Sequence, residues 1–190
     1  MLHSEADRRD FFRSAFGEWV EQFLASAEAR VAPQRYVRPP GALPEVAFLA
    51  ACSRCGECIK VCPPHAIMQV RAEGGFAAGT PYLDYQVQPC TVCSDMPCVR
   101  ACPTGALLFP PRGWEGYRLG ALELIPERCI TFRGESCAVC ATVCPVGERA
   151  ITTDEAGHPV IRAEGCVGCG ICVRACVTTP SSLVLNPLEG

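Results

Sequence analysis

Aromatic residues and charges are scarce in this chain, and long apolar runs are absent. Aromatic residues make up 7% and charged residues 19% of the 190 positions, and the formal net charge is −3. No basic run stands out, which argues against a nucleic-acid partner. No stretch approaches the roughly 20 apolar residues that a membrane-spanning helix needs. We therefore expect one or two small domains with a thin protein core.

The usual signatures of catalytic and nucleotide-binding sites are also missing. The sequence has no C-x-x-C-H haem site, no phosphate-binding loop and no dinucleotide fingerprint. Only three histidines occur. His3 is terminal, and His158 precedes a proline in a turn. His65 follows Pro64 and is expected to be a loop residue rather than a ligand or a proton-transfer group. The sequence therefore does not predict an enzyme.

Cysteine, in contrast, is abundant. The 16 cysteines fall into four groups of four with none left over. The groups, numbered one to four along the chain, are Cys52, Cys55, Cys58, Cys62; Cys90, Cys93, Cys98, Cys102; Cys129, Cys137, Cys140, Cys144; and Cys166, Cys169, Cys172, Cys176.

The spacing of the cysteines favours iron–sulfur clusters. Groups one and four are C-x2-C-x2-C-x3-C, the run typical of bacterial ferredoxins. Three thiolates this close reach three corners of one cubane, and the fourth cysteine, following a short helix, points to a neighbouring cluster. Groups two (C-x2-C-x4-C-x3-C) and three (C-x7-C-x2-C-x3-C) have longer loops, which change the exposure and hydrogen bonding of sulfur and so tune reduction potentials. We expect all sixteen cysteines to bind the iron of four [4Fe–4S] clusters.

Zinc and disulfides are weaker interpretations of the same cysteines. Structural zinc usually takes two separated C-x2-C pairs, whereas a C-x2-C-x2-C run crowds three ligands together. Disulfides between cysteines this close in sequence would be strained. A three-iron cluster would require a lost ligand, and all sixteen positions are filled.

Small and basic residues accompany the cysteines. Prolines follow the fourth cysteine in groups one to three and begin turns that need no amide donor (Pro63, Pro103 and Pro145). Three glycines allow the backbone to approach the sulfur atoms (Gly56, Gly168 and Gly170). Basic residues also lie inside the groups, among them Arg54, Lys60, Arg100 and Arg174. They either are ordinary solvated side chains or soften the negative charge of the clusters.

A strand–loop–helix–strand unit recurs about four times along residues 34–190. Short apolar runs follow each fourth cysteine, in "CPPHAIMQV", "CPTGALLF", "CPVGERAITT" and "CVTTPSSLVL". Others precede groups two to four, in "PYLDYQV", "ALELI" and "HPVIRA". Before group one, "PEVAFLAA" predicts a helical turn entered from the extended segment "RYVRPPGALP". We expect an α+β fold in this domain.

Residues 1–33 form a separate predicted segment. Apolar residues recur at helical spacing between residues 4 and 31, and Pro33 ends the pattern. These residues are Phe12, Phe16, Trp19, Val20, Phe23, Leu24 and Ala27. We expect an amphipathic helix that packs on its own domain or docks to a partner or membrane surface.

The irregular spacings, in their fixed order, resemble the NapG/MauM-type ferredoxins, a family of polyferredoxins. The resemblance covers residues 36–190 and rests on "RPPGALPEVAFLAACSRCGECIKVCP", on "AGTPY" before "PCTVCSDMPCVRACPTGAL", on "ERCITFRGESCAVCATVCP" and on "CVGCGICVRACV". More broadly, the chain is similar to the four-cluster subunits of molybdopterin oxidoreductases. The resemblance implies a duplicated bacterial dicluster ferredoxin-like fold.

The broader resemblance implies nested pairing, in which groups one and four share two clusters and groups two and three share the other two. The four ligand sets would then be Cys52, Cys55, Cys58, Cys176; Cys166, Cys169, Cys172, Cys62; Cys90, Cys93, Cys98, Cys144; and Cys129, Cys137, Cys140, Cys102. Tandem pairing, one with two and three with four, is the alternative, and the linkers between groups are too similar in length to decide.

The function expected is electron transfer, as a subunit or shuttle of a larger oxidoreductase system. The alternative is an assembly or structural module that its clusters merely stabilise. The resemblance implies a molybdopterin enzyme or a quinol-oxidising membrane protein as a redox partner. The N-terminal helix is a candidate for peripheral docking.

The segment "DRRDFFR" bears on the cellular compartment. It keeps the arginine pair of the twin-arginine signals that NapG-type relatives usually carry. Asp7 replaces the usual hydroxyl residue, and Glu18, Glu21 and Gln22 interrupt the apolar run that a signal needs. Thiolate clusters also suit a reducing compartment. We therefore expect a cytoplasmic protein, with periplasmic export as the alternative.

Overall fold

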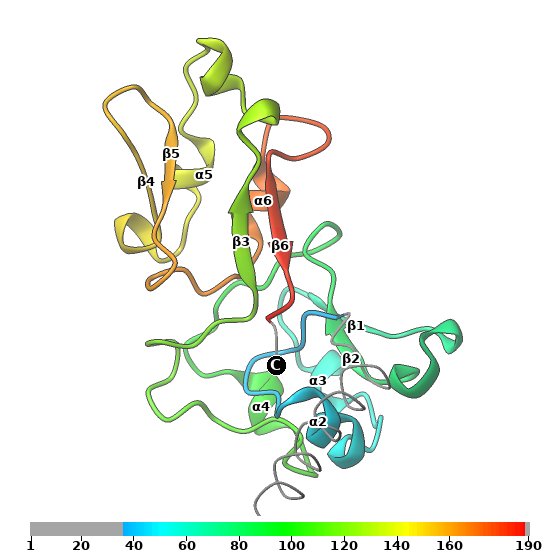
Figure 1. Cartoon of the computed structure of the whole chain (residues 1–190). Coiled ribbons are helices and arrows are strands. Elements are labelled where there is room, and N and C mark those ends of the chain that lie inside the picture. Colours follow the sequence, from blue (N-terminus) through cyan, green and yellow to red (C-terminus); the bar gives the residue numbers. More distant parts are fainter. Residues whose placement is uncertain (1–35, 189–190) are drawn as a thin grey trace, which may run out of the picture. The chain divides into compact units, whose positions relative to one another are not determined.

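The computed structural model describes residues 36–188, and the N-terminal helix expected between residues 4 and 31 lies outside this range. Short helices and short strands alternate along the described chain (Figure 1). The α-helices are α2 (Glu45–Ala51), α3 (Glu57–Lys60), α4 (Pro97–Arg100), α5 (Val139–Thr142) and α6 (Ile171–Ala175). The 3-10 helices are η1 (Ala72–Ala77), η2 (Pro126–Arg128), η3 (Ile130–Arg133) and η4 (Gly147–Arg149). The strands are β1 (Ile67–Gln69), β2 (Pro81–Leu83), β3 (Ala121–Leu124), β4 (Ile151–Thr153), β5 (Pro159–Ile161) and β6 (Leu183–Asn186).

The strands form three antiparallel pairs. β1 pairs with β2, with Ile67 opposite Leu83. β4 pairs with β5, with Ile151 opposite Ile161. β3 pairs with β6, with Leu124 opposite Leu183. The mixed helix-and-strand architecture expected from the sequence is therefore present.

The elements divide between two halves of the described chain, a first half of residues 36–118 and a second half of residues 119–188. The first half holds α2, α3, α4, β1 and β2, and the second holds α5, α6 and the other four strands (Figure 1). In the second half the outer strands β3 and β6 enclose the β4–β5 hairpin in sequence. In the first half the β1–β2 hairpin is likewise enclosed in sequence by an outer pairing, but this pairing is only a single bridge between Ala42 and Leu107.

Several predicted strands are shorter than their apolar runs. In "PYLDYQV" only β2 is a strand, because a turn follows at Asp84. In this turn the Asp84 carbonyl accepts hydrogen bonds from the amides of Val87 and Gln88. "CPTGALLF" forms no strand beyond the bridge at Leu107. Pro110 and Pro111 follow it and have no amide donors to extend a ladder. The helical turn predicted in "PEVAFLAA" is confirmed as α2, which buries Phe48.

Helix packing brings consecutive cysteine groups together. α3 packs against α4, and α5 packs against α6. The buried core combines aliphatic residues with cysteines, and the cysteines come from both halves (Cys58, Cys62, Cys90, Cys98, Cys169 and Cys172). Among the described helices, none has the length and apolar character that a bilayer crossing requires.

An ion pair is buried beside α2. The Arg38 side chain is only 4% exposed, and its guanidinium donates to both carboxylate oxygens of Glu45, at 2.6 and 2.9 Å. It also donates to the Thr80 hydroxyl and to the carbonyl of Pro81 at the start of β2. These bonds tie the extended segment before group one to α2 and to the hairpin.

Candidate metal centres

Four cavities of similar size lie in the described chain, and each is lined by four cysteines. We name them sites A to D. Their cysteines are Cys52, Cys55, Cys58 and Cys102 at site A; Cys90, Cys93, Cys98 and Cys62 at site B; Cys166, Cys169, Cys172 and Cys144 at site C; and Cys129, Cys137, Cys140 and Cys176 at site D. The open space at the four sites is about 370, 340, 350 and 320 Å³ in the same order.

Each site takes three cysteines from one group and the fourth from its neighbour in sequence. The third cysteine of every group lies on the short helix, and the fourth follows the helix end, as Cys58 and Cys62 do around α3. Because α3 packs against α4, Cys62 reaches the loop of group two and Cys102 reaches that of group one. The second half repeats this exchange through α5 and α6.

The nested pairing implied by the broader resemblance is contradicted by this grouping. It would place Cys176 with Cys52, but Cys176 lines site D with Cys129. It would place Cys62 with Cys166, but Cys62 lines site B with Cys90. The grouping is that of the tandem alternative. The physical reason is the short reach of a fourth cysteine, which is set by which helices pack together.

Left-handed backbone shapes the loops between the first two cysteines. Arg54, Val92 and Gly168 each lie two residues after the first cysteine of a group, and their φ values are +59°, +57° and +66°. The left-handed conformation turns the loop sharply, so that both flanking thiols face one cavity. Gly56 and Gly170 adopt it as well, with φ values of +77° and +82°. Two non-glycine residues accept it too, which costs roughly 1–3 kcal/mol each.

Burial raises the pKa of several of these thiols when no metal is bound. It raises the pKa of Cys58 and of Cys90 to about 12, and nearby thiols add to the rise. Burial likewise raises the pKa of Cys98 and of Cys169 to about 11. Such soft, crowded sulfur donors suit iron, which binds the thiolate form and displaces the protons. Four thiolates around one cavity match the ligand number of a [4Fe–4S] cluster.

Site D differs from the others because more hydroxyl groups contact its sulfur atoms, and at shorter distances. Cys176 Sγ lies 3.2 Å from the Ser182 hydroxyl and 3.3 Å from that of Thr178, and Cys129 Sγ lies 3.2 Å from that of Thr131. Burial alone would raise the pKa of Cys176, but these hydroxyls and nearby amides outweigh burial and lower it to about 6. Sequence reasoning missed these hydroxyls, although C-x-T recurs at Cys102, Cys129 and Cys176.

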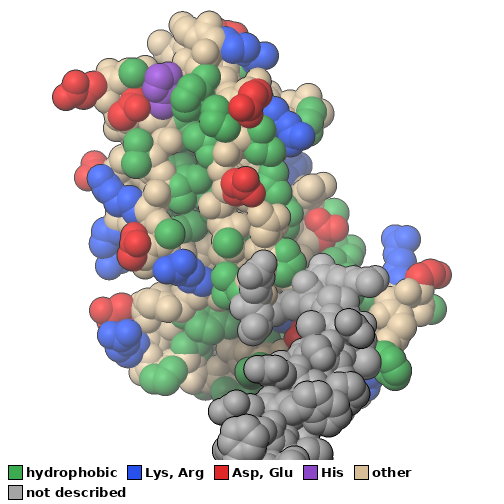
Figure 2. Space-filling view, in the orientation of Figure 1, with side chains coloured by type: hydrophobic (Ala, Val, Ile, Leu, Met, Phe, Trp, Pro, Cys, Tyr) green, Lys and Arg blue, Asp and Glu red, His purple; other side chains and the backbone are tan. Residues whose placement is uncertain are grey.

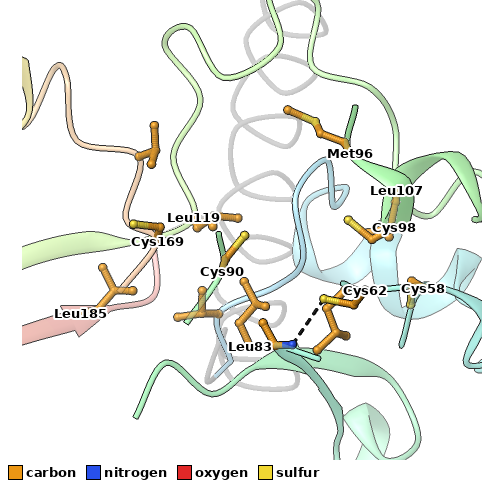
Figure 3. Close-up of a cluster of buried hydrophobic side chains, with 14 of the residues drawn as sticks. Cys58, Cys62, Leu83, Cys90, Met96, Cys98, Leu107, Leu119, Cys169 and Leu185 are labelled. Carbon is orange, nitrogen blue, oxygen red and sulfur yellow. Dashed lines mark hydrogen bonds between the residues drawn. The ribbon is translucent and has the colours of Figure 1, made fainter. Parts of the chain in front are cut away.

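Each site lies next to the following one. Cys98 of site B contributes to the raised pKa of Cys58 at site A, and Cys140 of site D contributes to that of Cys172 at site C. Sites B and C meet across the two halves, where the Cys90 amide donates to the Cys169 carbonyl at 3.2 Å. Figure 3 shows Cys90 and Cys169 side by side next to Leu119. The order is therefore A, B, C, D.

Other predicted residues lie around the sites. The guanidinium of Arg54 donates to the backbone carbonyls of Ala78 and Phe76 and lines site A. Lys60 pairs with Glu57 in solvent. Arg100 donates to the Asp95 carbonyl. His65 is an exposed loop residue, as expected.

Trp114 was not anticipated. Its indole Nε1 donates to the Cys93 carbonyl at 2.8 Å, and the ring lines site B.

Similarity to known proteins agrees with the cysteine sites. Residues 51–106 match the model of a 4Fe-4S dicluster domain, and residues 126–147 and 163–178 match that of a 4Fe-4S binding domain. The methylamine utilization ferredoxin-type protein MauM of Methylophilus methylotrophus is 34% identical over 98% of this chain and 89% of its own length. The ferredoxin-type protein NapG of Escherichia coli is 36% identical over 95% of this chain and 84% of its own length.

These similarities extend over nearly the whole chain and include both halves. The small mixed fold is of the ferredoxin-like type, and four [4Fe–4S] clusters are its cofactors. The chain is an electron-transfer protein of an oxidoreductase system rather than a catalytic enzyme. It belongs to the NapG/MauM family of ferredoxin-type proteins.

Proposed function

We propose that the chain is a linear relay within a larger oxidoreductase system, with sites A and D at its two ends. The sixteen cysteines act as ligands in the four sets defined above, three from one group and one from its neighbour. Each bound [4Fe–4S] cluster supplies a one-electron carrier. The residues of this chain fix the order and spacing of these carriers and shield them from water.

The contact that carries this proposal is the hydrogen bond between Cys90 and Cys169. Without it, the two halves would be two separate two-site carriers. Around it, the Tyr85 hydroxyl donates to the Leu185 carbonyl at 2.8 Å, also across the halves. Gly170 packs so closely on the Tyr85 side chain that a Cβ there would clash. This close packing supports continuous transfer between sites B and C.

We further propose that the two halves are two dicluster units that arose by duplication. Each half has a hairpin between its two cysteine groups, β1–β2 in the first and β4–β5 in the second. Each also has an outer pairing, reduced to the Ala42–Leu107 bridge in the first half and extended as β3–β6 in the second.

The ligand sets can be tested on anaerobically purified protein. Iron and sulfide analysis should give sixteen irons per chain, and a count well below that after full reconstitution would defeat the four-cluster assignment. Anomalous scattering at the iron edge from crystals of this protein should place Cys176 on the cluster bound by Cys129. Finding Cys176 on the cluster bound by Cys52 would restore nested pairing.

Protein-film voltammetry tests the relay against the alternative of a cluster-stabilised assembly module. A relay requires that the clusters cycle reversibly between oxidation states. Clusters that are present in full number but cannot be cycled would favour the assembly module. Steady turnover of a substrate by the isolated chain would contradict both.

The negative charge of the protein, as well as its family, supports our proposal for its redox partners. The chain has a formal net charge of −3, and thiolate ligation makes the loaded sites more negative. We expect docking to a basic patch on a molybdopterin oxidoreductase or a quinol-oxidising membrane protein. The rate of electron transfer to a small basic c-type cytochrome, used as a probe, should fall as ionic strength rises. A rate independent of salt would contradict charge-guided docking.

The cytoplasmic location and the docking role of the N-terminal helix stay predictions. The location rests on Glu18, Glu21 and Gln22, which interrupt the apolar run after the arginine pair, and the docking role rests on the apolar residues at helical spacing between residues 4 and 31. N-terminal sequencing of native protein from fractionated cells tests the location. A periplasmic form that begins near residue 28 would overturn it.

A further inference from the structure

We propose that three hydroxyl groups, those of Thr131, Thr178 and Ser182, make site D the highest-potential site of the four. Electrons in partly reduced protein then settle at the site D end of the relay. This inference rests on the ligand sets and the linear order proposed above, and it adds a thermodynamic direction to them.

Within residues 36–188, these hydroxyl groups hydrogen-bond only to cysteine sulfur. Thr131 contacts Cys129 Sγ, and both Thr178 and Ser182 contact Cys176 Sγ, at 3.2–3.3 Å. Thr131 and Ser182 are 7% and 3% exposed, so water does not readily compete for their protons. A cysteine bound to iron carries no proton, so each hydroxyl must be the donor in the loaded protein.

Hydrogen bonds to a ligand sulfur favour the reduced cluster. Reduction adds negative charge to the cluster and its thiolates, and a donor stabilises that charge more strongly than the charge of the oxidised form. Burial strengthens the effect because little solvent screens it. Each hydroxyl at site D therefore raises the reduction potential there.

The other sites have fewer and longer hydroxyl contacts within the described residues. Site A has one, between Thr104 and Cys102, at 3.8 Å. Site B has one, between Thr91 and Cys93, at 3.5 Å. No hydroxyl contact to a site C cysteine occurs among residues 36–188. The number and the short distances of its hydroxyl donors thus distinguish site D from the other sites.

Backbone amides do not separate the sites in this way. At site B the Ala66 amide donates to Cys62 Sγ at 3.3 Å, the contact dashed in Figure 3. At site D the Ser182 amide donates to Cys176 Sγ at 3.5 Å. At site A, amides near Cys102 outweigh burial and lower the pKa of that thiol, and at site C the Gly168 amide acts on Cys166 in the same sense, although burial still raises the pKa of Cys166. All four sites therefore receive amide donors.

Positive charge at the other sites is a competing influence: Arg54 lines site A, and the half-buried Arg118 acts to lower the pKa of Cys166 at site C, against burial, which raises it. A guanidinium beside a cluster also favours the reduced form. Arg54, however, is exposed and directs its donors to the backbone carbonyls of Ala78 and Phe76. Solvent screens such a charge. The buried hydroxyls should therefore outweigh it.

Voltammetry with redox-poised EPR on the full-length holoprotein tests the proposal. We expect Thr131→Val and Ser182→Ala each to move the highest-potential wave to lower potential and to leave the other waves in place. Thr131→Ser keeps the hydroxyl and should leave that wave near its original position. Thr104→Val, at the long site A contact, should move a different wave by less.

The outcomes separate this inference from the proposal it rests on. Each variant is first checked for sixteen irons per chain. Fewer than sixteen irons in the parent protein would overturn the ligand sets. Sixteen irons with an unmoved highest wave in both Thr131→Val and Ser182→Ala would overturn only the inference. The inference is also overturned if that wave responds instead to Arg54→Gln.

Discussion

At the scale of single residues, the structure depends on a few places where a change of one atom or one charge should have a large effect. Gly168 is one of them. It adopts a φ of +66°, and a Cβ added there would fall on the backbone of Gly120, next to the start of β3. Gly56 also has a positive φ, but nothing lies within 4 Å of its added Cβ.

Gly168→Ala should therefore destabilise the holoprotein more than Gly56→Ala. Gly56→Ala introduces only left-handed backbone strain, about 1–2 kcal/mol. Gly168→Ala adds the clash with backbone that cannot move freely, for a total of about 2–4 kcal/mol. Anaerobic denaturant unfolding of both variants measures the difference. Equal midpoints would show that the close approach to Gly120 does not matter.

The buried Arg38–Glu45 pair should matter far more than the exposed Lys60–Glu57 pair. Arg38→Met leaves a carboxylate that is 8% exposed without its partner, which should destabilise the protein by about 3–5 kcal/mol. Lys60→Met removes a pair whose side chains are 69% and 44% exposed, and this loss should change stability little because solvent screens the charges. Replacing both members in Arg38→Met/Glu45→Leu should recover much of the loss. If the double variant were as unstable as Arg38→Met, the uncompensated charge would not be the cause.

At the scale of elements, short helices and hairpins decide which cysteines meet. The helices α3, α4, α5 and α6 each span only four or five residues, too few to be stable alone. They are held by packing in pairs and by cysteines on both sides of a cavity. The linker of residues 110–118 returns over the first half, where the Tyr117 hydroxyl accepts the Gly41 amide at 2.7 Å.

Trp114 makes that linker part of site B. Trp114→Ala removes both the ring that lines the cavity and the hydrogen bond to the Cys93 carbonyl. We expect an iron chelator to bleach this variant several-fold faster than the parent. Trp114→Phe keeps an aromatic ring, so it should bleach at a rate between those of the parent protein and Trp114→Ala. If all three proteins bleached at the same rate, the linker would not protect site B.

At the scale of the whole molecule, the protein interior is built largely around its metal sites. Six cysteines belong to the single buried core, and aromatic residues are only 7% of the chain. Figure 2 shows basic and acidic side chains interspersed over one face, with hydrophobic side chains between them. Stability must therefore come in large part from ligand binding, because binding to the folded chain draws the equilibrium away from the unfolded one.

Removal of the clusters should accordingly unfold the protein. In the apoprotein, four cavities lined by thiols replace the metal sites that hold the short helices of each half together, and the thin core of the described residues cannot compensate. We expect near-ultraviolet circular dichroism and the cooperative thermal transition to disappear after anaerobic chelation. Reconstitution with iron and sulfide should restore both. An apoprotein that kept a cooperative transition would contradict this view.

The cysteine spacings by themselves determined the chemistry of this protein. Three thiols within a few residues can surround one cubane whatever the rest of the chain does, so the cofactor and the electron-transfer role follow from local sequence. The spacing of groups two and three, in fixed order with the ferredoxin runs, carried the resemblance to the family.

Only the tertiary structure decided which groups share a site. Linkers of similar length permit both nested and tandem pairing, and the choice depends on which short helices pack together, a property of contacts distant in sequence. The order of the sites rests on the meeting of Cys90 with Cys169. The contact of Ser182 with Cys176 at site D also depends on the folded structure, because the turn before β6 brings these two residues together. Ligand identity is a local property of the chain, whereas spacing, order and potential arise from how the chain folds back on itself.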